Sequence, residues 1–178
     1  FISLIAVCIM GACLGIGSFK GVIDNAPDVD DIDIMPLGYA SFLYDDHGNQ
    51  IRKLAAPDSN RLPVSIDQIP EDLQHAVVAI EDERFYEHNG IDVRGILRAG
   101  VKALTTGNIS EGASTITQQL LKNNVFTNWT NESTWIEKFT RKFQEQYLAI
   151  QVEEKIGDKN VILENYLNTC LLYTSDAA

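Results

Sequence analysis

The stretch EDERFYEHNG, from Glu81 to Gly90, combines acids, an Arg, two aromatic residues and a His. It follows a helical pattern that Pro70 opens and that repeats apolar residues at the spacing of one helix face. Such a stretch has three interpretations: a solvated helix end, a metal site, or the acid–base end of an active site. The rest of the sequence decides between them.

Glu81 is the acid of this stretch that lies at the edge of the apolar face, one turn after Val77 and four residues before Phe85. A carboxylate that is half-buried against apolar neighbours is suited to proton transfer. We therefore expect Glu81 to be half-buried, and Asp82 and Glu83 to be solvated. Because runs of charge are usually solvated, a surface location for all of these acids fits the spacing equally well.

The sequence pattern favours neither a metal site nor a disulfide framework. His88 has no second His at the spacing of a metal-binding helix, so we expect a structural His that bonds a backbone group at the helix end. Cys8 and Cys13 lie in an apolar run and Cys170 lies near the end of the chain. That arrangement forms no disulfide framework and no CxxC metal motif.

The composition indicates one globular domain behind an apolar N-terminal segment. The chain has 178 residues, of which 45% are hydrophobic, and a formal net charge of -11. This charge argues against nucleic acid as a partner, because a nucleic-acid binder carries a basic face. Residues 1–19 carry no charge and approach the about 20 apolar residues of a membrane helix. We predict a transmembrane anchor there, with a cleaved signal peptide as the alternative.

The remaining chain divides into a small β segment and a helical domain. Residues 20–69 form a linker and a short hairpin, because ASFLYDDHGNQIRKL alternates apolar residues around a turn. From residue 70 onward the periodicity is helical. The longest run, Trp135 to Lys155, carries a stripe of apolar residues, which we expect to be its buried face: Ile136, Phe139, Phe143, Tyr147 and Ile150. The predicted fold class is mainly α.

Two later stretches add polar groups suited to binding. In EGASTITQQLLKNN, Thr115 can cap a helix with Gln118 as its capping-box partner, and the helix start offers N–H groups to an anion. Gln118 and Lys122 share one face of that helix. An ordinary capped helix is the alternative. RKFQEQYLAIQVE places Arg141 four residues before Glu145, which is also the spacing of a surface ion pair.

Taken in order, AVVAIEDERFYEHNGIDVRGILRA, EGASTITQQLLKN, RKFQEQYLAIQVE and ILENYLN resemble the successive motifs of the peptidoglycan glycosyltransferases (glycosyltransferase family 51). These are the chain-polymerising domains of class A penicillin-binding proteins and their monofunctional relatives. The resemblance runs from about Tyr44 to Asn168. It implies a mainly α, lysozyme-like domain on the extracytoplasmic side of the cell membrane, held by a single-pass anchor.

The resemblance also implies the reaction and the partners. Such enzymes join lipid II to a lipid-linked glycan chain through a β-1,4 bond and release undecaprenyl pyrophosphate. The partners are therefore lipid II, the lipid-linked glycan chain and the cytoplasmic membrane, with cell-wall synthesis or division proteins as further candidates. A divalent cation, Mg or Mn, is expected to bind with the substrate pyrophosphate.

Roles carry over by motif position. Glu81 matches the catalytic base, and Glu145 matches the second acid, which lies near the pyrophosphate or its cation. The remaining matched positions are expected to bind substrate: Phe85, His88, Ser114, Thr117, Gln118, Gln119, Lys122, Arg141 and Lys142. The fourth motif matches residues that we expect to be mainly structural: Ile162, Leu163, Tyr166, Leu167 and Asn168.

Departures from the motifs set the domain limits and leave alternatives open. Gln144 stands where members often carry a Lys, and the loop NVFTNWTNESTW has no Arg. We place the glycosyltransferase domain at residues 70–168, truncated at its C-terminal end, and treat residues 169–178 as an atypical tail that is not native. The alternatives are a lytic glycosidase or transglycosylase of lysozyme-like fold, and an inactive membrane-anchored glycan-binding fragment.

Overall fold

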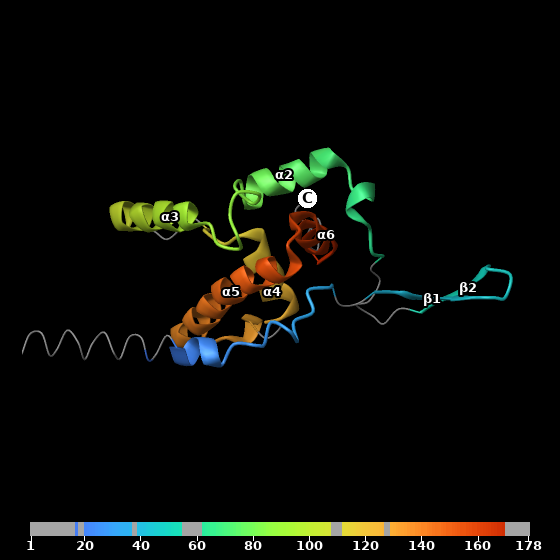
Figure 1. Cartoon of the computed structure of the whole chain (residues 1–178), viewed down its shortest axis with the longest axis horizontal. Coiled ribbons are helices and arrows are strands. Elements are labelled where there is room, and N and C mark those ends of the chain that lie inside the picture. Colours follow the sequence, from blue (N-terminus) through green and yellow to red (C-terminus); the bar gives the residue numbers. More distant parts are fainter. Residues whose placement is uncertain are drawn as a thin grey trace, which may run out of the picture.

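The structure, a computed structural model, describes residues 17, 20–36, 39–54, 62–107, 112–126 and 129–169. Its elements follow one another from the hairpin to the last helix (Figure 1): β1 (Ser41–Tyr44), β2 (Gln50–Leu54), η1 (Ile66–Gln68), α2 (Glu71–Glu81), α3 (Val93–Thr106), α4 (Ile116–Asn124), η2 (Trp129–Asn131), α5 (Trp135–Ile156) and α6 (Lys159–Thr169). The predicted mainly α class is confirmed, and the small β segment is a two-stranded antiparallel hairpin.

Helix α4 is the centre of the domain, since it packs against both α5 and α6. Its nine residues include five buried ones. One core cluster joins Ile116 and Leu120 to α6, and a second joins Leu121 to Leu148 and Val152 of α5. The short helix is therefore enclosed on most sides, and its polar side chains must find partners inside the protein.

The helix ends follow the predicted signals in part. The Thr115 hydroxyl accepts a hydrogen bond from the Gln118 N–H at 3.3 Å and caps α4 as predicted, but the Gln118 side chain bonds elsewhere and closes no capping box. Thr134 and Glu137 form a capping box at the start of α5. Gly157, with φ of 67°, ends α5 as predicted.

The predicted buried stripe of α5 is wrong for three of its five residues, although Tyr147 does pack against a core cluster. Ile136, Phe139 and Ile150 are exposed, whereas the buried residues of the helix include Gln144, Glu145 and others: Leu148, Ala149, Val152 and Glu153. Polar residues occupy the inner face because they bond to one another and to α4. A hydropathy pattern assigns such a face to solvent.

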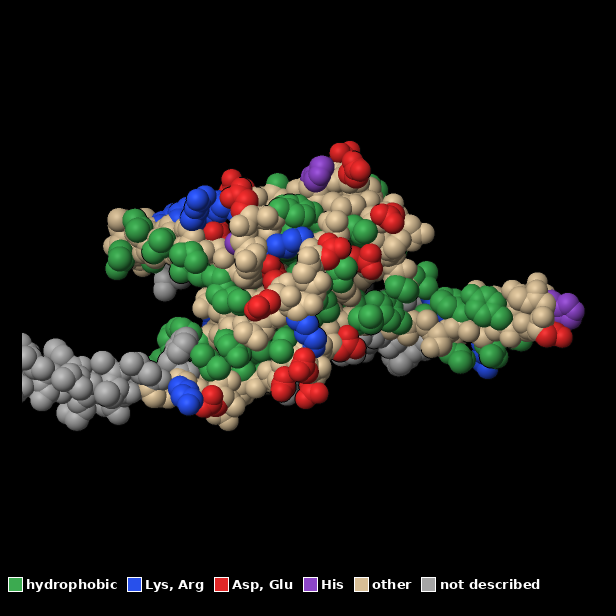
Figure 2. Space-filling model, in the orientation of Figure 1, with side chains coloured by type: hydrophobic (Ala, Val, Ile, Leu, Met, Phe, Trp, Pro, Cys, Tyr) green, Lys and Arg blue, Asp and Glu red, His purple; other side chains and the backbone are tan. Residues whose placement is uncertain are grey.

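Helix α3 and the hairpin project from opposite sides of this core (Figure 1). On α3 an exposed apolar strip contains Val93, Leu97, Val101 and Leu104. Figure 2 shows Lys and Arg side chains along one side of this helix and hydrophobic side chains along another. Helix α3 is therefore amphipathic, with its apolar strip turned to the outside.

The predicted transmembrane anchor at residues 1–19 lies outside the described residues, apart from Gly17. Within the described ranges, no helix combines the length and the apolar character that a membrane crossing requires. Apart from Thr169, the predicted tail at residues 169–178 also lies outside the described part of the chain.

Gly90 fixes how the EDERFYEHNG stretch meets the core. Its φ is +82°, and a Cβ there would lie 2.5 Å from the Ala149 carbonyl carbon and oxygen and 2.8 Å from the Ile150 nitrogen. Backbone on α5 cannot move away as a side-chain tip could. Only glycine allows this loop to lie directly against α5.

We expect Gly90→Ala to lower the free energy of unfolding by about 2–4 kcal/mol, because it adds a left-handed backbone penalty to a backbone clash. Gly100→Ala is the matched control. Gly100 lies in α3, and a Cβ there would meet no atom within 4 Å, so we expect a gain of about 0.5–1 kcal/mol. Urea denaturation of both variants checks this, and equal effects would contradict the close approach.

Candidate active site

A hollow of about 340 Å³ lies where the end of α2 meets α4 and α5. It gathers seven of the predicted site residues, which are Glu81, Ser114, Gln118, Gln119, Lys122, Lys142 and Glu145. Ile80 and Gly112 complete the lining. Three separate segments of the sequence, residues 80–81, 112–122 and 142–145, therefore contribute to one concavity lined mainly by polar groups that can orient a ligand.

Glu81 and Asp82 have exchanged the environments that we predicted for them. Glu81, the last residue of α2, is exposed, whereas Asp82 is buried at 6% exposure. The helix ends between them, and Asp82 adopts φ of -158°, so its side chain turns inward instead of continuing the helical rotation. The half-buried setting predicted for Glu81 and the solvated setting predicted for Asp82 are both wrong.

Asp82 joins the EDERFYEHNG stretch to α4. Its carboxylate accepts a hydrogen bond from the Ile116 N–H at 3.0 Å and lies 2.9 and 3.0 Å from His88 Nε2, which donates to it. His88 thus bonds a side chain, where we predicted a backbone group. We predicted that the N–H groups at the start of α4 would be offered to an anion. One of these N–H groups donates to Asp82 and another to Thr115, so the anion at this helix start is the protein's own Asp82.

Glu81 faces the hollow beside Gln119. The Gln119 Nε2 group donates to Glu81 Oε2 at 2.9 Å, and Gln119 Oε1 accepts from the Tyr166 hydroxyl at 3.1 Å. A carboxylate at the exposed end of α2 is in this way connected to α6. Tyr166 was predicted to be structural, so its link to the site is a feature that sequence reasoning missed.

Lys142 is the centre of the cationic side of the hollow. Its Nζ donates to Ser114 Oγ at 2.8 Å, to Gln118 Oε1 at 3.2 Å and to Glu145 Oε2 at 3.0 Å. Gln118 in turn donates from Nε2 to the Gly90 carbonyl at 3.2 Å. These contacts use the three N–H donors of the ammonium group and hold it in one place, so its charge acts on the hollow from a fixed position.

Glu145 is fully buried between two cations. Its second oxygen pairs with Arg141 Nη1, and Arg141 Nε donates to Glu132 Oε1 at 2.6 Å. Burial lowers the pKa of Arg141, but the hydrogen bonds and charges of Glu132 and Glu145 outweigh burial and raise it. The predicted alternative of a surface ion pair is therefore wrong, since this pair is enclosed. Glu132 was not predicted, because it lies in the loop before α5.

Lys122 is the second cation of the hollow. Its Nζ lies 3.7 Å from the centroid of the Trp129 ring, over the ring face. Such cation–π contacts hold an ammonium group without neutralising it. The charge of Lys122 therefore stays available to a bound anion.

Four predicted site residues lie outside the lining of this hollow. Phe85 is fully buried in the core, and His88 bonds Asp82 as described. The Thr117 hydroxyl donates to Glu153, and Arg141 lies behind Glu145. These residues therefore do not line the hollow, and they contact the residues and helices that form it.

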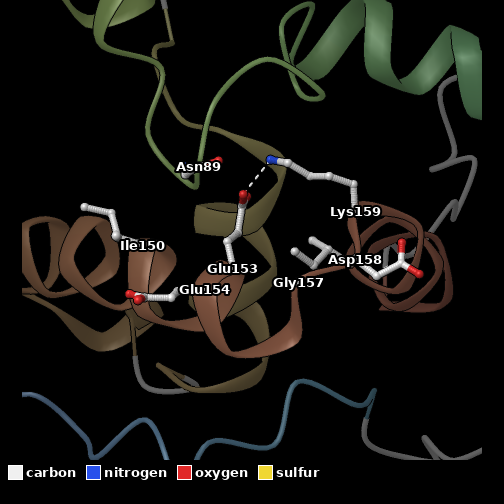
Figure 3. Close-up of a pocket in the computed structure, with 8 residues that line it drawn as sticks. Asn89, Ile150, Glu153, Glu154, Gly157, Asp158 and Lys159 are labelled. Carbon is white, nitrogen blue, oxygen red and sulfur yellow. Dashed lines mark ion pairs between the residues drawn. The ribbon is translucent and has the colours of Figure 1, made fainter.

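A second hollow of about 410 Å³ lies further along α5, where it turns into α6 (Figure 3). Figure 3 shows Glu153 and Lys159 pointing toward each other across it, with 2.6 Å between Glu153 Oε2 and Lys159 Nζ. Lys159 also lies over the Phe85 ring, 4.4 Å from its centroid. With Thr117 bonded to the other oxygen of Glu153, this group clamps α4, α5 and α6 together.

An ion pair at the start of α3 fixes how the chain leaves the EDERFYEHNG stretch. Arg84 donates to both carboxylate oxygens of Asp92, at 3.3 Å from Nε and 2.5 Å from Nη2. The hydrogen bond from Arg84 holds the pKa of Asp92 at about 2, below its ordinary value of 3.8. The folded state thus favours the ionised form, so this stabilisation is present above about pH 3.8 and is lost as the pH falls through about 2.

We expect Asp92→Asn to lower the free energy of unfolding by about 1 kcal/mol at pH 6, a value kept small because the pair is partly solvated. The difference between wild type and variant is expected to shrink as the pH falls from 5 toward 2. Urea denaturation across this range measures it, with Asp72→Asn, an exposed acid on α2, as control. A difference that does not change with pH would contradict the ion-pair assignment.

Comparison with known proteins identifies the class to which this fold and site belong. The family model described as "Transglycosylase" matches residues 47–176. Penicillin-binding protein 1A of Clostridium perfringens (strain 13 / Type A) is 42% identical over 152 residues, which is 83% of this chain and 21% of the relative. Penicillin-binding protein 1A of Escherichia coli (strain K12) is 39% identical over 171 residues, 95% of this chain and 19% of the relative.

Penicillin-binding protein 1A/1B of Bacillus subtilis (strain 168) is 38% identical over 166 residues, 93% of this chain and 17% of the relative. The chain spans about a fifth of the length of these relatives. The match covers most of this chain, including every segment that lines the hollow. The chain therefore belongs to the transglycosylase family.

Proposed function

We propose that this chain is a peptidoglycan glycosyltransferase, an inverting hexosyltransferase that polymerises lipid II into β-1,4 glycan strands. One observation carries the proposal: an exposed carboxylate, Glu81, and two cations held by their neighbours, Lys122 and Lys142, line the same hollow. A sugar transfer that releases a pyrophosphate needs a base at one end and positive charge at the other.

In the proposed reaction Glu81 accepts the proton of the 4-hydroxyl of the acceptor N-acetylglucosamine. The oxygen attacks the anomeric carbon of the lipid-linked glycan chain from the face opposite the pyrophosphate. The new carbon–oxygen bond forms as the bond to the pyrophosphate breaks, which inverts the anomeric centre. The leaving undecaprenyl pyrophosphate takes the electron pair, and Lys122 and Lys142 stabilise its growing charge. Glu81 is exposed, so it can return its proton to water.

The exposed setting of Glu81 favours synthesis over lysis. A lytic enzyme protonates a departing sugar oxygen, and its acid is kept neutral by apolar enclosure. Glu81 has no such enclosure. A lytic enzyme also releases no pyrophosphate, so it would have no use for two cations held at the same hollow.

A divalent cation bound with the pyrophosphate remains a prediction. The resemblance placed Glu145 near the pyrophosphate or its cation, but both oxygens of Glu145 already pair with Arg141 and Lys142. Among the described residues, the group of carboxylates and His that lies close enough to hold an ion is Asp45, Asp46 and His47, on the hairpin. The donor set of the hollow does not fit a metal site, and we derive no step through one.

We further propose that the domain has a lysozyme-like fold and works at the extracytoplasmic surface of the cell membrane. Contact with a membrane surface is supported by α3, whose exposed apolar strip lies beside exposed Arg94, Arg98 and Lys102. Apolar and cationic faces side by side are typical of helices that lie in a membrane interface. A single-pass anchor and cell-wall synthesis or division partners remain predictions.

The proposal is tested with Glu81→Gln in the full-length protein. We expect polymer formation from labelled lipid II to fall by about 10²–10⁴-fold, as loss of a general base does, while lipid II binding stays nearly unchanged. Glu83→Gln, which alters an exposed neighbouring acid, is the control and should polymerise like wild type. Polymer yields from Glu81→Gln that equal those of wild type would remove Glu81 from the role of base.

Purified cell-wall sacculi given to the same proteins separate synthesis from lysis. The wild-type protein is expected to leave sacculi uncut and to require the lipid pyrophosphate for polymerisation. Soluble muropeptides released from sacculi, with no polymer from lipid II, would replace the synthase proposal by the lytic alternative.

Lys122→Ala tests the cationic end of the hollow. We expect kcat/KM for lipid II to fall by about 10–100-fold, because one charge that meets the leaving pyrophosphate is lost, and inhibition by inorganic pyrophosphate to weaken. Lys53→Ala removes an exposed cation on β2, outside the hollow, and serves as the control. Equal kinetics of the two variants would exclude Lys122 from the site.

A further inference from the structure

We propose that Tyr166 positions the catalytic base, Glu81, through the side-chain amide of Gln119. The inference rests on the proposed function for the role of Glu81 as base. It assigns a positioning role to α6, a helix whose residues we otherwise expected to be structural.

The geometry is a chain of two hydrogen bonds that runs from the core to the site. The Tyr166 hydroxyl donates to Gln119 Oε1 at 3.1 Å, and Gln119 Nε2 donates to Glu81 Oε2 at 2.9 Å. Tyr166 is only 4% exposed and belongs to the same core cluster as Phe85 and Leu120. Packing therefore fixes its phenol ring, and the hydroxyl is a fixed point for the two groups beyond it.

The orientation of the Gln119 amide follows from its two neighbours. A carboxamide has an acceptor oxygen on one side and a donor NH₂ group on the other. If the amide were reversed, its oxygen would face the Glu81 carboxylate, which also only accepts when ionised. The Tyr166 hydroxyl stabilises the productive orientation by donating to the amide oxygen. Gln119 then presents its NH₂ group to Glu81.

Glu81 needs this support because of where it lies. It is an exposed side chain at the last residue of α2, and an exposed Glu samples several rotamers in water. A general base must lie within hydrogen-bond reach of the attacking hydroxyl in a narrow range of positions. The amide of Gln119, fixed by a buried tyrosine, limits the carboxylate to one part of the hollow.

The role is tested by Tyr166→Phe in the full-length protein, which removes the hydroxyl and keeps the ring. We expect kcat for lipid II polymerisation to fall about tenfold, the effect of one lost positioning bond, with KM changed less than about twofold because the ring and the cations are untouched. Tyr147→Phe is the matched control, since Tyr147 packs on the other core cluster. Equal kcat values for the two variants would overturn the proposal.

A double-mutant cycle with Gln119→Ala distinguishes positioning from general stability. If Tyr166 acts through Gln119, Tyr166→Phe causes no further loss of kcat in the Gln119→Ala background. The same fractional loss in both backgrounds would mean that Tyr166 acts by another route and would overturn the proposal.

A readout without turnover separates this inference from the proposed function. The side-chain amide NMR signal of Gln119, assigned by its loss in Gln119→Ala, is expected to shift in Tyr166→Phe and in Glu81→Gln but not in Tyr147→Phe. An unmoved signal in Tyr166→Phe would refute the relay whatever the enzyme does. If the signal shifts in Tyr166→Phe but the wild-type protein makes no polymer, the relay is upheld and the synthase function is refuted.

Discussion

The site depends on the hydrogen bonds of the buried Asp82 carboxylate. This carboxylate accepts one hydrogen bond from the backbone N–H of Ile116, the first residue of α4, and another from the imidazole of His88. An unpaired carboxylate at this depth would cost several kcal/mol, so the end of α2, the following loop and the start of α4 are held in one arrangement. Glu81, one residue earlier, is thereby placed beside Gln119 without being buried itself.

The same principle operates along the inner face of α5. Glu145 is paired by Arg141 and Lys142, and Glu153, two turns further on, is paired by Lys159 and Thr117. Buried ion pairs contribute little net stability compared with apolar packing. The fold is strongly destabilised, however, when one partner is lost and the other charge stays buried without a partner. They specify one mutual position of α4, α5 and α6, and the hollow depends on that position. Gly90 adds a close backbone contact with α5.

Sequence reasoning succeeded where local chemistry decides the outcome. The cap at Thr115, the stop at Gly157, the hairpin and the helical class all follow from neighbouring residues. It failed where tertiary partners decide. Ile136 and Phe139 lie outside, because the inner face of α5 carries Glu145 and Glu153, whose charges are paired inside the protein, together with apolar residues further along the helix. The motif resemblance located Glu81, Gln119 and Lys142, but it could not predict that Glu132 bonds to Arg141 and that Tyr166 bonds to Gln119.

Glu81 and Asp82 show why helical periodicity misassigned the two acids. The periodicity continues α2 through both residues, and on that assumption Glu81 belongs at the apolar edge. The helix instead ends at Glu81, and the extended φ of Asp82 turns its side chain inward. Asp82 is buried and already bonded to Ile116 and His88, so a ligand in the hollow cannot reach it, whereas its exposed neighbour Glu81 lines that hollow. Burying one acid thus fixes the backbone, and the other acid stays accessible at a fixed place. The division of roles arises from a single helix end.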